Sequence, residues 1–428
     1  AFFGERKVAQ LPELRGVQPR PFARIGVIGG GTMGAGIAVA ALLNKLDVTL
    51  IERDAPAADK ARAGIGKMLA DSVKRGKLSA ERRDTLLHDA FTIATDYAAL
   101  AGADLVIEAV FESMDVKKEV FRALDKVAKP GAVLATNTSY LDVNEIAAVT
   151  SRPGDVLGLH FFSPAHVMKL LEIVQADKTA PDVLATGFAL ARALKKVAVR
   201  ARVCDGFIGN RILKTCRTAT DHMVLEGASP FQIDRALTGF GLAMGPYAMA
   251  DLAGLDIGYI TRQRLLPTRD KRERWGEWAD RLHDMGRLGR KTGRGYYIYD
   301  DASPRGRADP EVDDLIAGER TRRGIAPRGF TDDEIIARYM AAMINESARV
   351  LGEGIAARPL DIDMTLLFGY GFPRWRGGPL HYADQIGLDK VLATIRTAAE
   401  DDPWFWQPAP LLEQLVAGGR SFDSLNGD

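Results

Sequence analysis

The stretch that decides the fold is RIGVIGGGTMGAGIA, which occupies residues 24–38. Its apolar first part is typical of a buried strand, and it leads through glycines in G-x-G-x-x-G order into a helical pattern. Such glycines permit a tight turn and let the backbone approach a pyrophosphate at the helix N-terminus. The spacing therefore predicts a dinucleotide-binding turn. The residues that we expect at the cofactor in this turn are Gly29, Gly31, Thr32, Met33 and Gly34.

A second apolar run ends in Glu52, 18 residues beyond Gly34, where an acidic residue binds the adenosine ribose in this kind of fold. A carboxylate there accepts a hydrogen bond from the 2′-hydroxyl and repels a 2′-phosphate. The sequence therefore favours NAD over NADP. Arg53 is the next residue and could accommodate the phosphate, so NADP is the alternative cofactor.

The order of apolar runs predicts the fold class. From Arg24 to about Val203, short Val/Ile/Leu-rich runs alternate with longer helical stretches, as in a Rossmann-type, doubly wound α/β sheet. After Asp205 helical periodicity dominates, and a stretch from Arg211 matches a later one from Arg338. We therefore expect all-α domains built from a tandem repeat of one helical unit.

These patterns also predict the domain boundaries, because a chain of 428 residues is too long for one core. We expect a linker from a missing upstream region over 1–20, a Rossmann domain over 21–204, a first helical copy over 205–300, and a linker with the second copy over 301–428.

Composition excludes several classes of function. The net charge is +1, so no field of one sign draws the chain to nucleic acid or a membrane surface. No apolar run approaches the roughly 18 residues of a membrane span. The two cysteines, Cys204 and Cys216, fit neither a disulfide framework nor a metal-ligand spacing, so we expect a reducing compartment and no metal site.

The stretch HFFSPAHVMKLLE, residues 160–172, holds a histidine and a carboxylate on two apolar runs that could pair as a hairpin. Histidine is the usual group for taking a proton from an alcohol near neutral pH, and a carboxylate on its far nitrogen fixes the tautomer. From the pattern alone, a packed core histidine is the better interpretation of His160, and a base oriented by Glu172 is the alternative.

The residues around His160 resemble a known family. GLHFFSPAHVMKLLE, with ATNTSYL before it and GFIGNR after it, resembles the L-3-hydroxyacyl-CoA dehydrogenases. More narrowly, essentially the whole chain resembles the dehydrogenase portion of the multifunctional fatty-acid β-oxidation proteins, in which an enoyl-CoA hydratase precedes the dehydrogenase. The resemblance reverses the interpretation of His160. It implies NAD-dependent oxidation of (S)-3-hydroxyacyl-CoA to 3-ketoacyl-CoA, with His160 as general base and Glu172 as its orienting partner.

The resemblance also assigns further site residues. Ser139 and Asn210 match positions that contact the reacting oxygen and thioester region of the substrate. Glu112 and Lys117 match cofactor-contacting positions, with Asn137 at the edge of that pocket. Taken without the resemblance, Glu112 and Lys117 could equally be a solvated charge pair at the start of a helix.

Arg75 matches a basic position that contacts CoA. It lies in a segment with Lys67, Lys74 and Lys77, which could meet the phosphates of CoA or could simply be a solvated face. Ser163 and Tyr140 differ from the single-unit enzymes of the family, which leaves the hydrogen bonds around the substrate less defined than the His–Glu pair.

Two rival functions remain: a non-catalytic dinucleotide-binding protein on the same fold, and a 3-hydroxyacid dehydrogenase that uses a lysine. We expect acyl-CoA as substrate, no nucleic-acid partner, and a fused hydratase or a thiolase partner in the full-length protein. The location that we expect is a bacterial cytoplasm, with the peroxisome as the alternative. Ala337 aligns with Asn210, so the second copy is expected to support the first without a site of its own. Because a tandem copy can cover the apolar face of the first within one chain, we expect the isolated chain to be a monomer.

Overall fold

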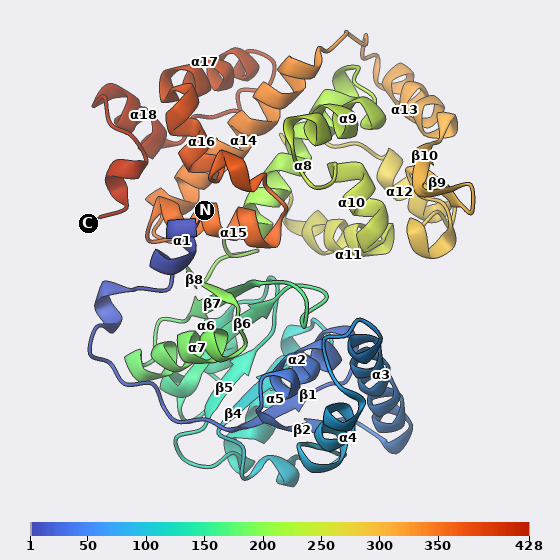
Figure 1. Cartoon of the computed structure of the whole chain (residues 1–428). Coiled ribbons are helices and arrows are strands. Elements are labelled where there is room, and N and C mark those ends of the chain that lie inside the picture. The colour runs from blue at the N-terminus through green and yellow to red at the C-terminus, as the bar shows by residue number, and fades with distance from the viewer. Residues whose placement is uncertain (1, 428) are drawn as a thin grey trace. The chain divides into compact units, whose positions relative to one another are not determined.

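The computed structural model describes residues 2–427, and its contacts divide the chain into two compact units (Figure 1). The first unit comprises the residues up to Asn210 together with Glu353–Tyr370. The second comprises Arg211–Gly352 and the residues from Gly371 onward. The domain boundaries predicted from the sequence patterns stay a prediction.

The first unit is built on an eight-stranded sheet in the order β3-β2-β1-β4-β5-β6-β7-β8. Neighbouring strands run parallel except at the β6–β7 pair, which is antiparallel. The strands are β1 (Arg24–Ile28), β2 (Asp47–Ile51), β3 (Phe91–Ala94), β4 (Leu105–Glu108), β5 (Val133–Thr136), β6 (Val156–Phe161), β7 (Leu170–Gln175) and β8 (Val197–Arg202). This confirms the predicted doubly wound α/β class. The strand order reverses between β1 and β4, which is where ligands bind in such sheets.

Helices cover the sheet because its strands are apolar on both faces. One core cluster joins the helices α2 and α7 to alternate strand residues, among them Leu157, Leu159 and Phe161 of β6. Side chains alternate between faces along a strand, so His160 lies on the opposite face. The helices up to residue 193 are α1 (Phe2–Lys7), α2 (Thr32–Leu43), α3 (Ala55–Lys74), α4 (Ala80–Asp89), α5 (Met114–Val127), α6 (Val143–Ala147) and α7 (Pro181–Ala193).

The second unit is helical, apart from a hairpin of β9 (Tyr297–Asp300) and β10 (Ser303–Ala308). The helices from residue 209 onward are α8 (Gly209–Glu226), α9 (Pro230–Phe240), α10 (Pro246–Ala253), α11 (Leu255–Leu265), α12 (Trp278–Asp284), α13 (Pro310–Arg323), α14 (Asp332–Gly352), α15 (Pro359–Gly369), α16 (Pro379–Ile386), α17 (Leu388–Ala399) and α18 (Pro410–Ala417). Of these, α15 belongs to the first unit. The α/β sheet followed by helical domains is the predicted architecture.

The two helical copies pack against each other within the second unit. The helix α14 contacts α9, and Gln232 Nε2 donates to the Phe330 carbonyl at 2.8 Å. Arg211 Nε lies 2.6 Å from a Glu346 oxygen, so the long first helix of each copy is joined to the other by an ion pair. Each copy therefore covers surface of the other.

One segment of the second copy belongs to the first unit by its contacts. The helix α15 packs on β7, β8 and α1. The Arg358 guanidinium donates to the carbonyls of Val8 and Gln10, at 2.7 and 3.0 Å. The start of the chain and residues 353–370 thus complete the edge of the sheet at β8 (Figure 1).

Across residues 2–427, every helix is too short or too polar to cross a lipid bilayer.

Candidate functional site

The glycine turn between β1 and α2 has the geometry that a dinucleotide requires. Gly29 adopts a φ of +91°, which favours glycine, and a Cβ on Gly34 would lie 1.8 Å from the Gly29 carbonyl oxygen. Gly31 caps the N-terminus of α2, and a Cβ there would meet no atom within 4 Å. The space beside Gly31 at this helix N-terminus is therefore open, as a pyrophosphate held by the first backbone amides of a helix requires, and the turn fits the predicted cofactor.

Glu52 lies at the carboxyl end of β2, beside the glycine turn. Its Oε1 accepts from the Gly30 amide at 2.6 Å and its Oε2 accepts from the Arg53 amide at 3.0 Å. The Arg53 side chain is 84% exposed and bonds to Asp54 at 3.1 Å. The carboxylate is thus fixed at the turn while the neighbouring guanidinium is engaged by another acid. Both observations favour a free ribose hydroxyl over a 2′-phosphate.

Lys117 is fully buried between two carboxylates. Its Nζ lies 2.7 Å from Glu108 Oε1 and 3.3 Å from Glu112 Oε2, and Glu108 is also fully buried. Thr136, the last residue of β5, donates to Glu108 Oε2 at 2.6 Å. This burial excludes a solvated charge pair for Lys117. The sequence alone missed Glu108, although an acidic residue at the carboxyl end of a buried strand was a usable signal.

The same network fixes the residues after β5. Glu112 Oε1 accepts from the Thr138 hydroxyl at 2.6 Å and from the Ser139 amide at 2.8 Å. Asn137 Oδ1 accepts from the Phe161 amide at 2.9 Å, which ties the end of β5 to the end of β6. The structure therefore brings Lys117, Glu112, Ser139 and Asn137 together at the carboxyl edge of the sheet.

His160 and Glu172 are cross-strand partners in the antiparallel β6–β7 pair. His160 Nδ1 lies 2.6 Å from Glu172 Oε2, and the side chains are 5% and 0% exposed. Glu172 Oε1 accepts from the Gly209 amide at 3.0 Å. The rings of Phe162 and Phe207 flank the imidazole at 4.4 and 5.7 Å. Since Nδ1 faces the carboxylate, Nε2 is the nitrogen that remains for a substrate.

Asn210 follows Gly209 and ends the first stretch of the first unit. Its Oδ1 accepts from the Tyr370 hydroxyl at 2.7 Å, and the Tyr370 ring contacts Phe162 edge-on at 5.5 Å. Tyr370 was not predicted, because it lies 160 residues away in the second copy.

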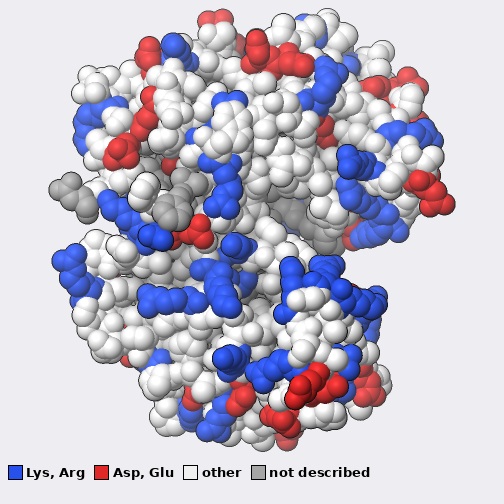
Figure 2. All heavy atoms as spheres, viewed as in Figure 1, with Lys and Arg blue, Asp and Glu red and all other residues white. Residues whose placement is uncertain are grey.

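Arg75 caps the C-terminus of α3, with Lys74 and Lys77 beside it, and all three are exposed. Figure 2 shows Lys and Arg side chains gathered over the part of the first unit that carries α3. Cations at a helix C-terminus are also stabilised by the helix dipole, so the cluster has a structural cause as well. Arg75 contributes to lowering the pKa of His166, after burial and Lys196, which places it near the loop that follows β6.

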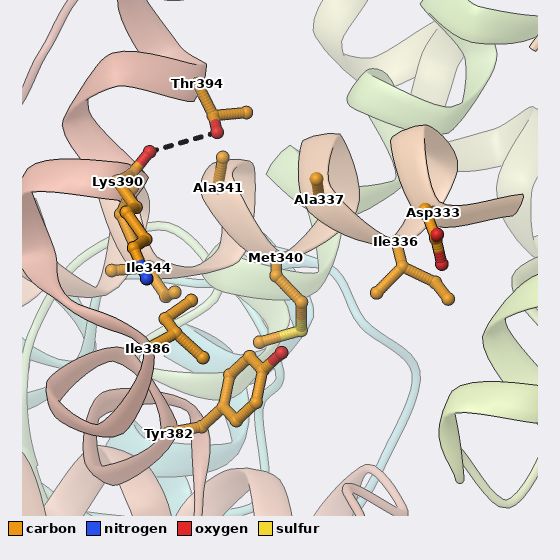
Figure 3. A pocket seen from close by; sticks show the side chains of 11 residues that line it. Asp333, Ile336, Ala337, Met340, Ala341, Ile344, Tyr382, Ile386, Lys390 and Thr394 are labelled. Carbon is orange, nitrogen blue, oxygen red and sulfur yellow. Dashed lines mark hydrogen bonds between the residues drawn. The ribbon is translucent and has the colours of Figure 1, made fainter. Parts of the chain in front are cut away.

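A cavity of about 330 Å³ opens in the second unit between α14, α16 and α17 (Figure 3). Its walls are mostly apolar and include Met340, Tyr382 and Ile386. Ala337, which aligns with Asn210, also lines it. The second copy thus has no polar amide where the first copy carries one. Within residues 2–427, no three His, Cys, Asp or Glu side chains gather as a metal site requires.

A glycine turn at the start of α2, an acid at the end of β2 and a buried histidine at the same sheet edge define a dinucleotide-dependent dehydrogenase. Comparison of the sequence with models of protein families identifies the family. Residues 24–204 match the NAD-binding domain of 3-hydroxyacyl-CoA dehydrogenase. Residues 206–299 and 335–423 both match its C-terminal domain, which confirms the tandem repeat. The chain belongs to the 3-hydroxyacyl-CoA dehydrogenase family, and its cofactor is NAD.

Known proteins agree with this assignment. The peroxisomal bifunctional enzyme of Danio rerio is 42% identical over 98% of this chain and 60% of its own length. The crystal structure of 3-hydroxybutyryl-CoA dehydrogenase from Escherichia coli K12 is 30% identical, with a TM-score of 0.78 over 93% of this chain and 98% of that one. The dehydrogenase part of multifunctional enzyme 1 from C. elegans has a TM-score of 0.68 at 28% identity, over 96% of both chains. This chain spans about 60% of the length of the peroxisomal bifunctional enzymes that it matches.

Proposed function

We propose that this chain oxidises the 3-hydroxyl of (S)-3-hydroxyacyl-CoA to the 3-ketone, as a step of fatty-acid β-oxidation. The observation that supports it most is the buried pair of His160 and Glu172 at the carboxyl edge of an NAD-binding sheet. NAD, when bound, supplies the nicotinamide that takes the hydride from C3. The family assignment favours this reaction over a non-catalytic binding protein and over a lysine-dependent hydroxyacid dehydrogenase.

His160 Nε2 takes the proton of the substrate hydroxyl. Glu172 accepts from Nδ1–H, which holds the imidazole in the tautomer with a free Nε2 and stabilises the imidazolium that forms. In the reverse direction the imidazolium polarises the ketone. Asn210 and Ser139 contact the reacting oxygen and the thioester, and the Glu112–Lys117–Glu108 network holds Ser139 in place.

The direct test is the reverse reaction. Mixing the protein with NADH and acetoacetyl-CoA should lower the NADH absorbance, and a His160→Ala variant should lose this activity. A surface variant, Glu145→Gln, is the matched control, because Glu145 is an exposed residue of α6 that pairs with Lys118. Absence of any activity in the wild-type chain would refute the proposed function.

The remaining length of the relatives suggests a second activity in the full-length protein. We infer a fused enoyl-CoA hydratase, because the matched relatives are named bifunctional or multifunctional enzymes and are longer than this chain. A thiolase is the partner that would consume the ketoacyl product. Hydration of a 2-enoyl-CoA by the full-length gene product tests the fusion.

We propose that the full-length protein is located in a peroxisome. The relatives are named as peroxisomal or glyoxysomal proteins, which supports the peroxisomal alternative over a bacterial cytoplasm. Fluorescence microscopy of the full-length protein in its own cells would distinguish the two.

We also propose that the isolated chain is a monomer. The Arg211–Glu346 ion pair and the α9–α14 contact join the two helical copies within one chain. A tandem copy supplies a packing surface at high effective concentration. Light scattering should report a monomer, and deletion of everything after about Pro304 should produce dimers or aggregates. A stable dimer of the intact chain would contradict this.

A further inference from the structure

The segment Glu353–Tyr370 lies in the second match to the C-terminal domain but packs on the first unit. The Arg202 amide at the end of β8 donates to the Ile355 carbonyl at 2.8 Å, which fixes the start of the segment. At its end, a Cβ on Gly369 would lie 2.5 Å from Leu170, the first residue of β7. Both ends of the segment are therefore held against β8 and β7, and β7 carries Glu172.

This placement brings Tyr370 to the predicted catalytic centre. Its hydroxyl donates to Asn210 Oδ1 at 2.7 Å, and its ring packs edge-on against Phe162, which contacts the His160 imidazole. A Cβ on Gly209 would lie 2.2 Å from the Tyr370 ring, so the glycine makes room for this ring. The same Gly209 donates its amide to Glu172. Tyr370 thus touches neighbours of both members of the His–Glu pair.

The direction of the hydrogen bond determines how the Asn210 amide is turned. Burial, followed by the nearby Glu172 and Tyr140, raises the pKa of Tyr370 well above its ordinary value, so the hydroxyl keeps the proton that it donates to Asn210 Oδ1. Asn210 Oδ1 is the acceptor, which leaves the Nδ2 hydrogens as the group that Asn210 can offer to a substrate oxygen. An amide without this partner could flip, because its oxygen and nitrogen ends have nearly the same shape.

We propose that Tyr370 is a positioning residue, which fixes the Asn210 amide with its Nδ2 donors available to the oxygen of the acyl-CoA substrate. The second helical copy therefore completes the site of the first unit, although Ala337 deprives it of a site of its own. The inference rests on the proposed function, since it assumes that Asn210 contacts substrate. It assigns the second copy a role in catalysis beyond packing.

The test is a double-mutant cycle with Tyr370→Phe and Asn210→Ala, read as kcat/KM for acetoacetyl-CoA and NADH. Phe keeps the ring and its contact with Phe162 and removes the hydroxyl. Tyr370→Phe should lower kcat/KM about two- to tenfold, as expected for one hydrogen bond. In the Asn210→Ala background it should have no further effect, because the amide that it orients is absent. NADH affinity should be unchanged throughout.

Tyr382→Phe is the matched control, because this tyrosine lines the cavity of the second unit (Figure 3) and should leave kcat/KM unchanged. Wild-type activity of Tyr370→Phe, or a full additional loss in the Asn210→Ala background, would overturn the positioning role while the proposed reaction stands. Wild-type activity of Asn210→Ala would instead remove Asn210 from the proposed site, and this inference with it.

Discussion

Replacing Glu172 by Gln tests the catalytic pair with the smallest change in shape. The carboxylate accepts two hydrogen bonds, from His160 Nδ1–H and from the Gly209 amide, in a fully buried position. A Gln side chain has one acceptor oxygen and one donor NH₂ group. If its oxygen faces Gly209, its NH₂ group faces His160 Nδ1, which must then become the acceptor. The proton moves to Nε2, and the histidine can no longer take a proton from the substrate.

The opposite orientation of the introduced amide is also unfavourable. It would set the NH₂ group against the Gly209 amide and leave a buried donor unpaired, at a cost of about 1–3 kcal/mol. In either orientation the imidazolium loses its counter-charge, which is worth about 4 kcal/mol for a pair about 4 Å apart at a partly screened site. Since about 1.4 kcal/mol corresponds to a factor of ten in rate, kcat should fall about 10²–10⁴-fold.

The assay is steady-state NADH oxidation with acetoacetyl-CoA, together with NADH titration and thermal unfolding of the same protein. We expect unchanged NADH affinity and an intact fold, because Gln fills the same volume. The control is Glu145→Gln, which removes an exposed carboxylate that pairs with Lys118. A Glu172→Gln enzyme within tenfold of the wild-type kcat would refute the reasoning, since no combination of the two orientations preserves the free Nε2 and the counter-charge.

The other predictions concern the base, the cofactor and the buried lysine. His160→Ala should lower kcat by about 10²–10⁴ with unchanged NADH affinity, and a near-wild-type rate in the same assay would end its role as base. Titration should show NADH binding at least tenfold more tightly than NADPH, about 1.4 kcal/mol, because of Glu52; equal affinities would mean that Arg53 dominates. Lys117→Met should lower the free energy of unfolding by about 3–5 kcal/mol, since Glu108 keeps a buried charge without its cation. Denaturant unfolding measures this against Lys118→Met, and equal midpoints would contradict it.

Sequence patterns predicted the features that depend on residues close together in the chain, such as the glycine turn. The glycine turn needs a positive φ at Gly29 and close approach at Gly34, and both requirements are visible in the sequence. The two apolar runs that carry His160 and Glu172 allowed a hairpin-like pair, and the strands adopt an antiparallel register that joins them. The pattern alone still favoured a packed core histidine, and only the resemblance to the family indicated the pair.

Contacts between different elements escaped this reasoning, whether the residues lie near or far apart in the chain. The burial of Lys117 depends on Glu108 and Glu112 closing over it from β4 and the loop that follows, which no helical pattern reveals. The helical repeat was readable, but its periodicity could not show that α15 would pack on β7 and β8. Tyr370 therefore had no sequence signal as a site residue, because its role depends on a partner 160 residues earlier.

The return of residues 353–370 to the first unit has a consequence for how the protein is made. A ribosome delivers the chain from its N-terminus, and domains usually fold in that order as they emerge. Here the first unit is complete only after residues 353–370 have been synthesised. Until then the outer face of β7 and β8 lacks α15, and Leu170 is without the helix that abuts it. Nascent chains halted before residue 353 should therefore be more sensitive to proteases and more dependent on chaperones than chains halted after residue 370.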